Sequence, residues 1–112
     1  MFIYNITFLI DESIEQQWLN ELKTNYIQTV LETGFFQSYQ LLQVTDSPNE
    51  GLTFCLQFRT NEISSLQSYQ NLYATQIESE HQQLFQNKLV TFSSTMKFID
   101  EQWISVPPKL KV

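Results

Sequence analysis

Residues 2–10, Phe-Ile-Tyr-Asn-Ile-Thr-Phe-Leu-Ile, alternate strictly between two faces of an extended chain. One face carries only large apolar or aromatic side chains, and the other mixes apolar with short polar ones. Alternation over such a length is typical of a β-strand with one buried face. A strand this apolar is more typical of the centre of a sheet than of its edge. We therefore expect the rest of the chain to form one sheet around residues 2–10.

Two longer segments, residues 14–33 and 63–84, have the spacing of amphipathic helices. Apolar side chains recur there every three or four positions, which places them on one side of a helix. Ser13 and Gln16 have the form of a capping box at the start of the first segment, and Gly34 can take the positive φ that ends it. We expect both helices to pack on the sheet through these apolar stripes.

Three further segments have the composition of β-strands. Residues 52–59 alternate as regularly as the first strand, and residues 35–45 are more polar, which suits an edge strand. A turn over residues 46–51 joins these two strands into a hairpin. In residues 90–98 the larger apolar side chains alternate with Thr, Ser and Lys, and we expect the apolar set to face the helices.

The predicted order of elements is β-α-β-β-α-β. Right-handed crossovers place residues 2–10 and 52–59 at the centre of a four-stranded antiparallel sheet, with the other two strands outside. This is the ferredoxin-like arrangement of the α+β class, with both helices on one face of the sheet. We expect one such domain over residues 1–100 and a C-terminal tail over residues 101–112.

The sheet face opposite the helices is neither charged nor fully apolar. Such a face suits pairing with a second copy of the chain, and symmetric pairing is the commonest form of oligomer. Two sheets packed face to face form a dimeric α/β barrel and can leave a cavity between them. The alternative is a Thr- and Ser-rich face that is simply solvated. The residues expected there are Ile3, Asn5, Thr7, Leu9, Thr53, Cys55, Gln57, Arg59, Thr91, Ser93 and Thr95, joined by Phe35, Tyr39 and Leu41 if the second strand keeps its register.

The charge balance excludes some classes of partner. Six Lys and Arg stand against twelve Asp and Glu, a net charge of −6. This charge repels phosphate backbones and argues against nucleic-acid binding. The sequence has neither a basic amphipathic stretch nor a long uninterrupted apolar one, so we expect no membrane association. A single cysteine, Cys55, suits a reducing compartment, and we expect a cytoplasmic protein.

No recognisable catalytic motif or Cys/His metal-ligand spacing is present, so the sequence predicts neither a metal nor a cofactor. His81 falls on the apolar stripe predicted for the second helix, together with Tyr73 and Leu84. It is either an acid–base group or a core histidine held by one hydrogen bond. Asn5, on the first strand, is either a polar anchor in a cavity or a satisfied amide at a dimer interface.

Short elements in a characteristic order run through most of the chain. They are Ile3-Tyr4-Asn5, Glu12-Ser13-Ile14, Trp18-Leu19, Val30-Leu31, Thr33-Gly34-Phe35, Gln57-Phe58, Leu66, Tyr69-Gln70, Glu80-His81, Phe85 and Phe92. In this order and spacing the chain resembles DUF4286, a bacterial family of domains of unknown function, over about residues 1–100. The resemblance implies a dimeric ferredoxin-like α/β barrel without an established activity.

The chain departs from the pattern of that family in both helices. Where relatives tend to have His-x-Pro, it has Tyr26-Ile27-Gln28 and Tyr73-Ala74-Thr75, which leaves His81 as the only histidine. More distantly, the implied fold is similar to that of small cofactor-free monooxygenases and haem-degrading enzymes. Some of those combine a first-strand Asn with a second-helix His, as Asn5 and His81 would here.

The sequence leaves three classes of function open. The first is a homodimeric module that binds a small molecule or a protein partner. The alternative is a cofactor-independent monooxygenase or haem-degrading enzyme that acts on a planar substrate between the sheets, with His81 and Asn5 in the site. A purely structural interaction protein would instead have a tightly filled interface. The candidates for ligand binding are Asn5, Thr7, Tyr39, Gln57, Arg59 and Ser93.

The tail is unusually apolar for a chain terminus. It carries Trp103, Ile104 and Val106 before Pro107-Pro108, a run that is costly to leave in water. Because the helices already cover one sheet face, we expect the tail to reach over the partner subunit or to close the mouth of the cavity. The alternative is a frayed terminus.

Overall fold

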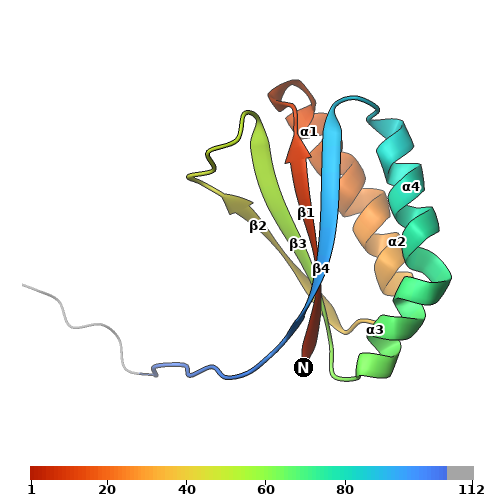
Figure 1. Ribbon diagram of the computed structural model, residues 1–112, viewed down its shortest axis with the longest axis vertical. Helices are drawn as coiled ribbons and strands as arrows, with labels where there is room; N and C mark the ends of the chain where they lie inside the picture. The colour runs from red at the N-terminus through yellow and green to blue at the C-terminus, as the bar shows by residue number, and fades with distance from the viewer. Residues whose placement is uncertain (106–112) are drawn as a thin grey trace, which may run out of the picture.

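The four strands form one antiparallel sheet in the order β2-β3-β1-β4 (Figure 1). The computed structural model describes residues 1–105. In it the first strand pairs along its whole length with both of its neighbours, so it is central, as predicted. The strands are β1 (Phe2–Ile10), β2 (Ser38–Val44), β3 (Leu52–Thr60) and β4 (Leu89–Lys97).

Both predicted helices are present, and they cover the same face of the sheet (Figure 1). A 3₁₀ turn at Glu12–Ile14 leads into the first one. Asp11 caps this turn because its Oδ1 accepts a hydrogen bond from the N–H of Ser13 at 2.9 Å, so the predicted capping box is replaced by an aspartate cap. The first helix comprises α1 (Glu15–Glu21), a π turn (Leu22–Tyr26) and α2 (Ile27–Glu32); the second comprises α3 (Ile63–Tyr69), a π turn (Gln70–Ala74) and α4 (Thr75–Leu84).

The π turn in each helix adds one residue to a turn and rotates the buried stripe. In the second helix the stripe steps from Tyr69 to Ala74, and both side chains are buried. Tyr73 and Leu84, which the regular spacing placed on the stripe, are 42% and 61% exposed. The predicted stripe was therefore wrong at these two positions: the π turn moves Tyr73 off the stripe, and after His81 the buried residue is Phe85, not Leu84.

Aromatic rings fill the layer between the sheet and the helices. Trp18 is fully buried, with its ring centroid 4.9 Å from that of Phe54 and 5.1 Å from that of Phe8. Tyr69 lies edge-on to Tyr4, at 5.5 Å between ring centroids. Burying a side chain of this size contributes roughly 1.5–3 kcal/mol, so the helices are held firmly on one face. Within residues 1–105, no helix lies over the other face of the sheet (Figure 1).

Strand β4 faces the opposite way to the predicted orientation. Its first residue, Leu89, pairs with Ile10, and both side chains are buried under the helices. The N–H of Asp11 donates to the carbonyl oxygen of Lys88 at 2.9 Å, which fixes this register. A shift of one residue exchanges the two faces of a strand, so the apolar set lies opposite the helices. That set is Val90, Phe92 and Met96, with Ser94 between them, whereas Thr91, Ser93 and Thr95 lie on the helix side.

Strand β2 begins later than predicted, because Phe36 turns into the core before it. Ser38 then pairs with Arg59, and this register places Tyr39 opposite Phe58 on the helix side of the sheet. The register does not run unbroken from residue 35. The predicted position of Tyr39 on the other face is therefore wrong.

The chain beyond β4 leaves the body of the domain. The N–H of Phe98 donates to the carbonyl oxygen of Met1 at 2.8 Å. After this contact residues 99–105 have no helix or strand, and they run away from the helix layer (Figure 1). The predicted role of Pro107-Pro108 lies outside the described residues. Within residues 1–105, no helix is both long and apolar enough to cross a membrane.

Candidate functional site

The sheet face without helices, called the open face below, is organised in rows that cross the four strands. Directly opposed residues share a row, so each row takes one side chain from each strand. The four rows are Val44-Thr53-Leu9-Val90, Leu42-Cys55-Thr7-Phe92, Gln40-Gln57-Asn5-Ser94 and Ser38-Arg59-Ile3-Met96.

The row Gln40-Gln57-Asn5-Ser94, called the amide row below, is a chain of side-chain hydrogen bonds. Gln40 Nε2 donates to Gln57 Oε1 at 2.7 Å, and Gln57 Nε2 donates to Asn5 Oδ1 at 3.3 Å. Asn5 Nδ2 donates to Thr7 Oγ1 at 3.1 Å and to Ser94 Oγ at 3.5 Å. Asn5 is 7% exposed, and the two glutamines are half-buried. These bonds hold three amide groups in a fixed line across the centre of the open face.

Large apolar side chains surround the amide row and are exposed. Contiguous exposed apolar patches are uncommon on monomeric proteins and often mark an interaction site. On the open face the exposed apolar side chains lie on the two edge strands, β2 and β4, on both sides of the polar residues of the central strands. They are Leu42 (44% exposed), Val44 (37%), Val90 (56%), Phe92 (54%) and Met96 (39%).

Two further contacts complete the open face. Thr7 Oγ1 lies 3.8 Å from the sulfur of Cys55, a free, half-buried cysteine. Arg59 Nη1 donates to Ser38 Oγ at 3.2 Å and brings a positive charge to the last row. The face thus offers amide, hydroxyl and guanidinium groups within an apolar frame.

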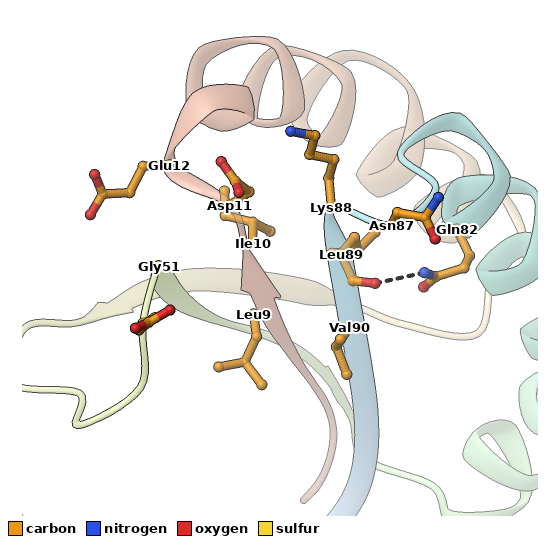
Figure 2. A pocket seen from close by; sticks show the side chains of 11 residues that line it. Leu9, Ile10, Asp11, Glu12, Gly51, Gln82, Asn87, Lys88, Leu89 and Val90 are labelled. Atoms are coloured by element: carbon orange, nitrogen blue, oxygen red, sulfur yellow. Dashed lines mark hydrogen bonds between the residues drawn. The ribbon is translucent and has the colours of Figure 1, made fainter.

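A recess with a volume of about 640 Å³ adjoins the open face where β1 ends and β4 begins. Figure 2 shows Leu9 and Val90 at the end nearer the open face, and Asp11, Glu12 and Lys88 at the other end. Hydrogen bonds from Ser13 hold the pKa of Asp11 below its ordinary value, so this carboxylate is ionised at neutral pH. The recess therefore continues the apolar row of Leu9 and Val90 into a charged rim.

The structure brings four of the predicted ligand-binding residues together. Asn5, Thr7, Gln57 and Arg59 all lie on the open face, as the alternation of the two central strands indicates. Tyr39 and Ser93 lie on the helix side instead, because β2 and β4 have a different register from the predicted one.

His81 is on the helix side of the sheet, in the core. Its Nε2 accepts a hydrogen bond from Trp18 Nε1 at 2.9 Å, so the proton of the neutral imidazole is on Nδ1. Its ring packs against Phe8 at 5.6 Å and Tyr26 at 4.7 Å between ring centroids. Burial lowers the pKa of His81 to about 4, and the nearby Glu21 carboxylate opposes this shift only in part. His81 is therefore uncharged at neutral pH.

The sheet separates His81 from Asn5. Phe8, which contacts His81, and Asn5 point to opposite faces of β1, so the two predicted catalytic candidates do not share a site. The side chain of His81 instead borders a small cleft of about 120 Å³ in the groove between the two helices. The cleft is lined by Glu21, Asn25, Tyr26, Thr29, Ile77, Glu80, His81 and Leu84.

Sequence reasoning missed part of the open face. Gln40, Ser94 and Phe92 belong to it, but β2 and β4 could be oriented only once the pairing was known. In β4 polar and apolar residues largely alternate, and in β2 the adjacent Leu41 and Leu42 break the alternation, so the sequence pattern left two plausible orientations for each edge strand. In the part of the chain that the structure describes, no cluster of three or more His, Cys, Asp or Glu side chains could hold a metal ion.

The order of the strands, the single helix layer and the bare opposite face define a ferredoxin-like α+β domain. The chain belongs to the family described as "Domain of unknown function (DUF4286)", which matches residues 1–99. The resemblance noted in the sequence is thereby confirmed. No protein of curated function matches the sequence.

Solved structures with the same fold have very different sequences. A dimeric ferredoxin-like protein from an uncultured marine organism has a TM-score of 0.65 and 11% identity, over 93% of this chain and 100% of that one. An EthD family protein from Bacillus halodurans has a TM-score of 0.62 and 10% identity, over 88% and 100%. An antibiotic biosynthesis monooxygenase has a TM-score of 0.61 and 14% identity, over 89% and 100%. At these identities the likeness shows the fold alone.

Proposed function

We propose that the protein is a homodimeric binding module in which two copies pair through their open faces and enclose a small ligand. The observation that carries the proposal is the amide row within an apolar frame. The exposed side chains of Leu42, Val90 and Phe92 gain most from leaving water, so they drive the pairing. A single chain has an open sheet, and a second sheet is needed to make the predicted barrel. The dimeric state of a ferredoxin-like structural neighbour supports this arrangement.

The ligand is a small molecule with an apolar body and at least one hydrogen-bonding group. The amide row bonds mainly within itself. Each amide oxygen keeps a free lone pair, and the side-chain nitrogens of Gln40 and Gln57 each keep a second hydrogen, whereas both hydrogens of Asn5 Nδ2 are used. Thr7 and Arg59 add a hydroxyl and a cation on either side of the row. A molecule with a carboxylate, carbonyl or hydroxyl group would match these donors. The recess beside Leu9 and Val90 offers a route into the interior.

The pairing is tested by sedimentation equilibrium at micromolar concentration. Wild-type protein is expected to be a dimer, and Phe92→Asp is expected to be a folded monomer because a buried unpaired charge opposes association. The matched control is Leu72→Asp, which alters a side chain that is 65% exposed on the helix layer. It should leave the dimer intact. A wild-type monomer, or a Phe92→Asp dimer of unchanged affinity, would refute the proposed interface.

Ligand binding is tested with the fluorescent probe 8-anilinonaphthalene-1-sulfonate, which combines a planar apolar body with an anionic group. Saturable binding by the dimer is expected, and it should weaken in Gln57→Leu, which removes amide donors at the centre of the row. Gln28→Leu, at an exposed position on α2, is the control. Equal binding by all three proteins would count against the amide row as a ligand site.

The enzyme alternative, with Asn5 and His81 on one substrate between the sheets, has no support in the geometry. His81 already bonds to Trp18, and the sheet lies between it and Asn5. A haem titration followed at the Soret band is the direct test, and we expect no spectral shift that depends on His81. A shift in the wild type that disappears in His81→Ala would restore the alternative.

A further inference from the structure

We propose that residues 98–104 form an arm that packs on the second copy of the chain. The inference rests on the proposed dimer and adds a second contact surface to it. The arm begins where the pairing of β4 with β1 ends, at the hydrogen bond from the N–H of Phe98 to the carbonyl oxygen of Met1.

The apolar side chains of the arm have no place in their own domain. Ile99, Trp103 and Ile104 are 84%, 87% and 80% exposed. The indole N–H of Trp103 donates only to Glu101 Oε1, at 3.0 Å, two residues away along the chain. The helix side of the sheet is already filled by aromatic rings, and in the proposed dimer the partner covers the open face, so folding back would offer no free core surface.

The direction of the arm points to the second copy as its occupant. The arm continues β4 and runs away from the helix layer (Figure 1). In a dimer paired through the open faces, the partner lies on the side of the sheet opposite the helices. Met96, in the last row of the open face, lies two residues before this segment, so the apolar surface of the face continues toward the arm. Each copy would send one arm over the other, as two-fold symmetry requires.

The two tryptophans make this contact measurable. Trp18 is fully buried within its own domain, whereas Trp103 is exposed unless a second chain covers it. Acrylamide quenching of the dimer should find both indoles protected. Dilution below the dissociation constant, or the monomer-forming Phe92→Asp variant, should release one quenchable indole. Trp103→Phe identifies that indole, because the quenchable signal should be missing in this variant.

The energetic test is the dimer dissociation constant of the double variant Trp103→Ser/Ile104→Ser. It should rise by at least about tenfold, since two large apolar side chains lose their buried contact. Leu72→Ser, an exposed leucine on the helix layer, is the control and should leave the constant unchanged.

The outcomes separate the arm from the dimer. If wild-type protein is monomeric throughout, both proposals are wrong. If it is dimeric but Trp103 stays fully quenchable and the double variant associates normally, the arm proposal alone is wrong. If Trp103 is protected even in the Phe92→Asp monomer, the arm folds on its own domain and the proposal is again wrong.

Discussion

The indole N–H of Trp18 donates a hydrogen bond to Nε2 of His81 at 2.9 Å and so connects the first helix to the second across the core. Both side chains are almost fully buried, Trp18 at 0% and His81 at 4% exposure. The bond gives the only histidine of the chain a structural partner and a fixed tautomer. Of the two roles that the sequence left open for His81, this geometry supports the core role.

Stability should therefore depend on pH through His81. Burial lowers its pKa to about 4 from 6.5, so below pH 6.5 the unfolded state binds more protons than the folded state. The contribution of neutral His81 to the free energy of unfolding is complete above pH 6.5. As the pH falls towards 4, up to about 3 kcal/mol of that contribution is lost. Urea unfolding across this range measures it. His81→Gln, which cannot titrate, should show a shallower dependence; parallel curves would contradict the prediction.

Replacing Trp18 by Phe should destabilise the fold strongly. The change removes the donor to His81 and leaves both a buried acceptor without a partner and a small cavity. We expect a loss of roughly 2–4 kcal/mol in the free energy of unfolding, measured by chemical denaturation. Tyr73→Phe, on a half-exposed ring, should change stability by less than about 0.5 kcal/mol. A similar loss in the two variants would show that the buried bond contributes little.

Two buried tyrosines should respond in opposite ways to the loss of their hydroxyl. Tyr4 donates to Glu78 Oε1 at 2.5 Å, so Tyr4→Phe deprives a half-buried carboxylate of a donor and should cost about 1–3 kcal/mol. The hydroxyl of Tyr69 is buried without a partner among the described residues. Tyr69→Phe should therefore be neutral or stabilise by up to about 1 kcal/mol. Thermal unfolding of both variants tests this, and equal destabilisation would refute it.

Replacing Gly51 by a residue with a side chain should destabilise the fold strongly, whereas the same change at Gly34 should destabilise it less. Both have positive φ, +80° and +79°. A Cβ on Gly51 would meet the carbonyl oxygen of Ile10, a backbone atom that cannot move aside, whereas a Cβ on Gly34 meets nothing within 4 Å. Gly51→Ala should cost on the order of 3 kcal/mol and Gly34→Ala about 1 kcal/mol, by thermal or urea unfolding. Equal costs would mean that φ alone matters and that the contact with Ile10 relaxes.

The central strands and the extent of the helices could be predicted because their signals are local. Alternation in β1 and β3 identifies two strands and correctly places Asn5 and Gln57 on the open face. Gly34, at φ +79°, follows Thr33, the C-cap residue of the first helix, so the helix ends within one residue of the predicted position. The pairing of two copies, the ligand and the location of the protein in the cell stay predictions.

The edge strands and the helix stripes could not be predicted in full because they depend on non-local contacts. An alternating strand has two orientations with the same pattern, and only the pairing of Leu89 with Ile10 decides between them for β4. The π turns likewise break the helical period without an obvious sequence mark, and they exchange Tyr73 for Ala74 on the buried side.

By itself, then, the amino-acid sequence determined the order of elements, the fold class and the polar residues of the two central strands. Backbone periodicity and turn chemistry are properties of neighbouring residues, so they can be read directly from the chain. Only the tertiary structure decided that Phe92 faces outward, that Tyr39 and Ser93 face the helices, and that His81 bonds to Trp18. These features depend on which residues meet across the sheet and the core, and that choice is made by packing of segments far apart in the sequence.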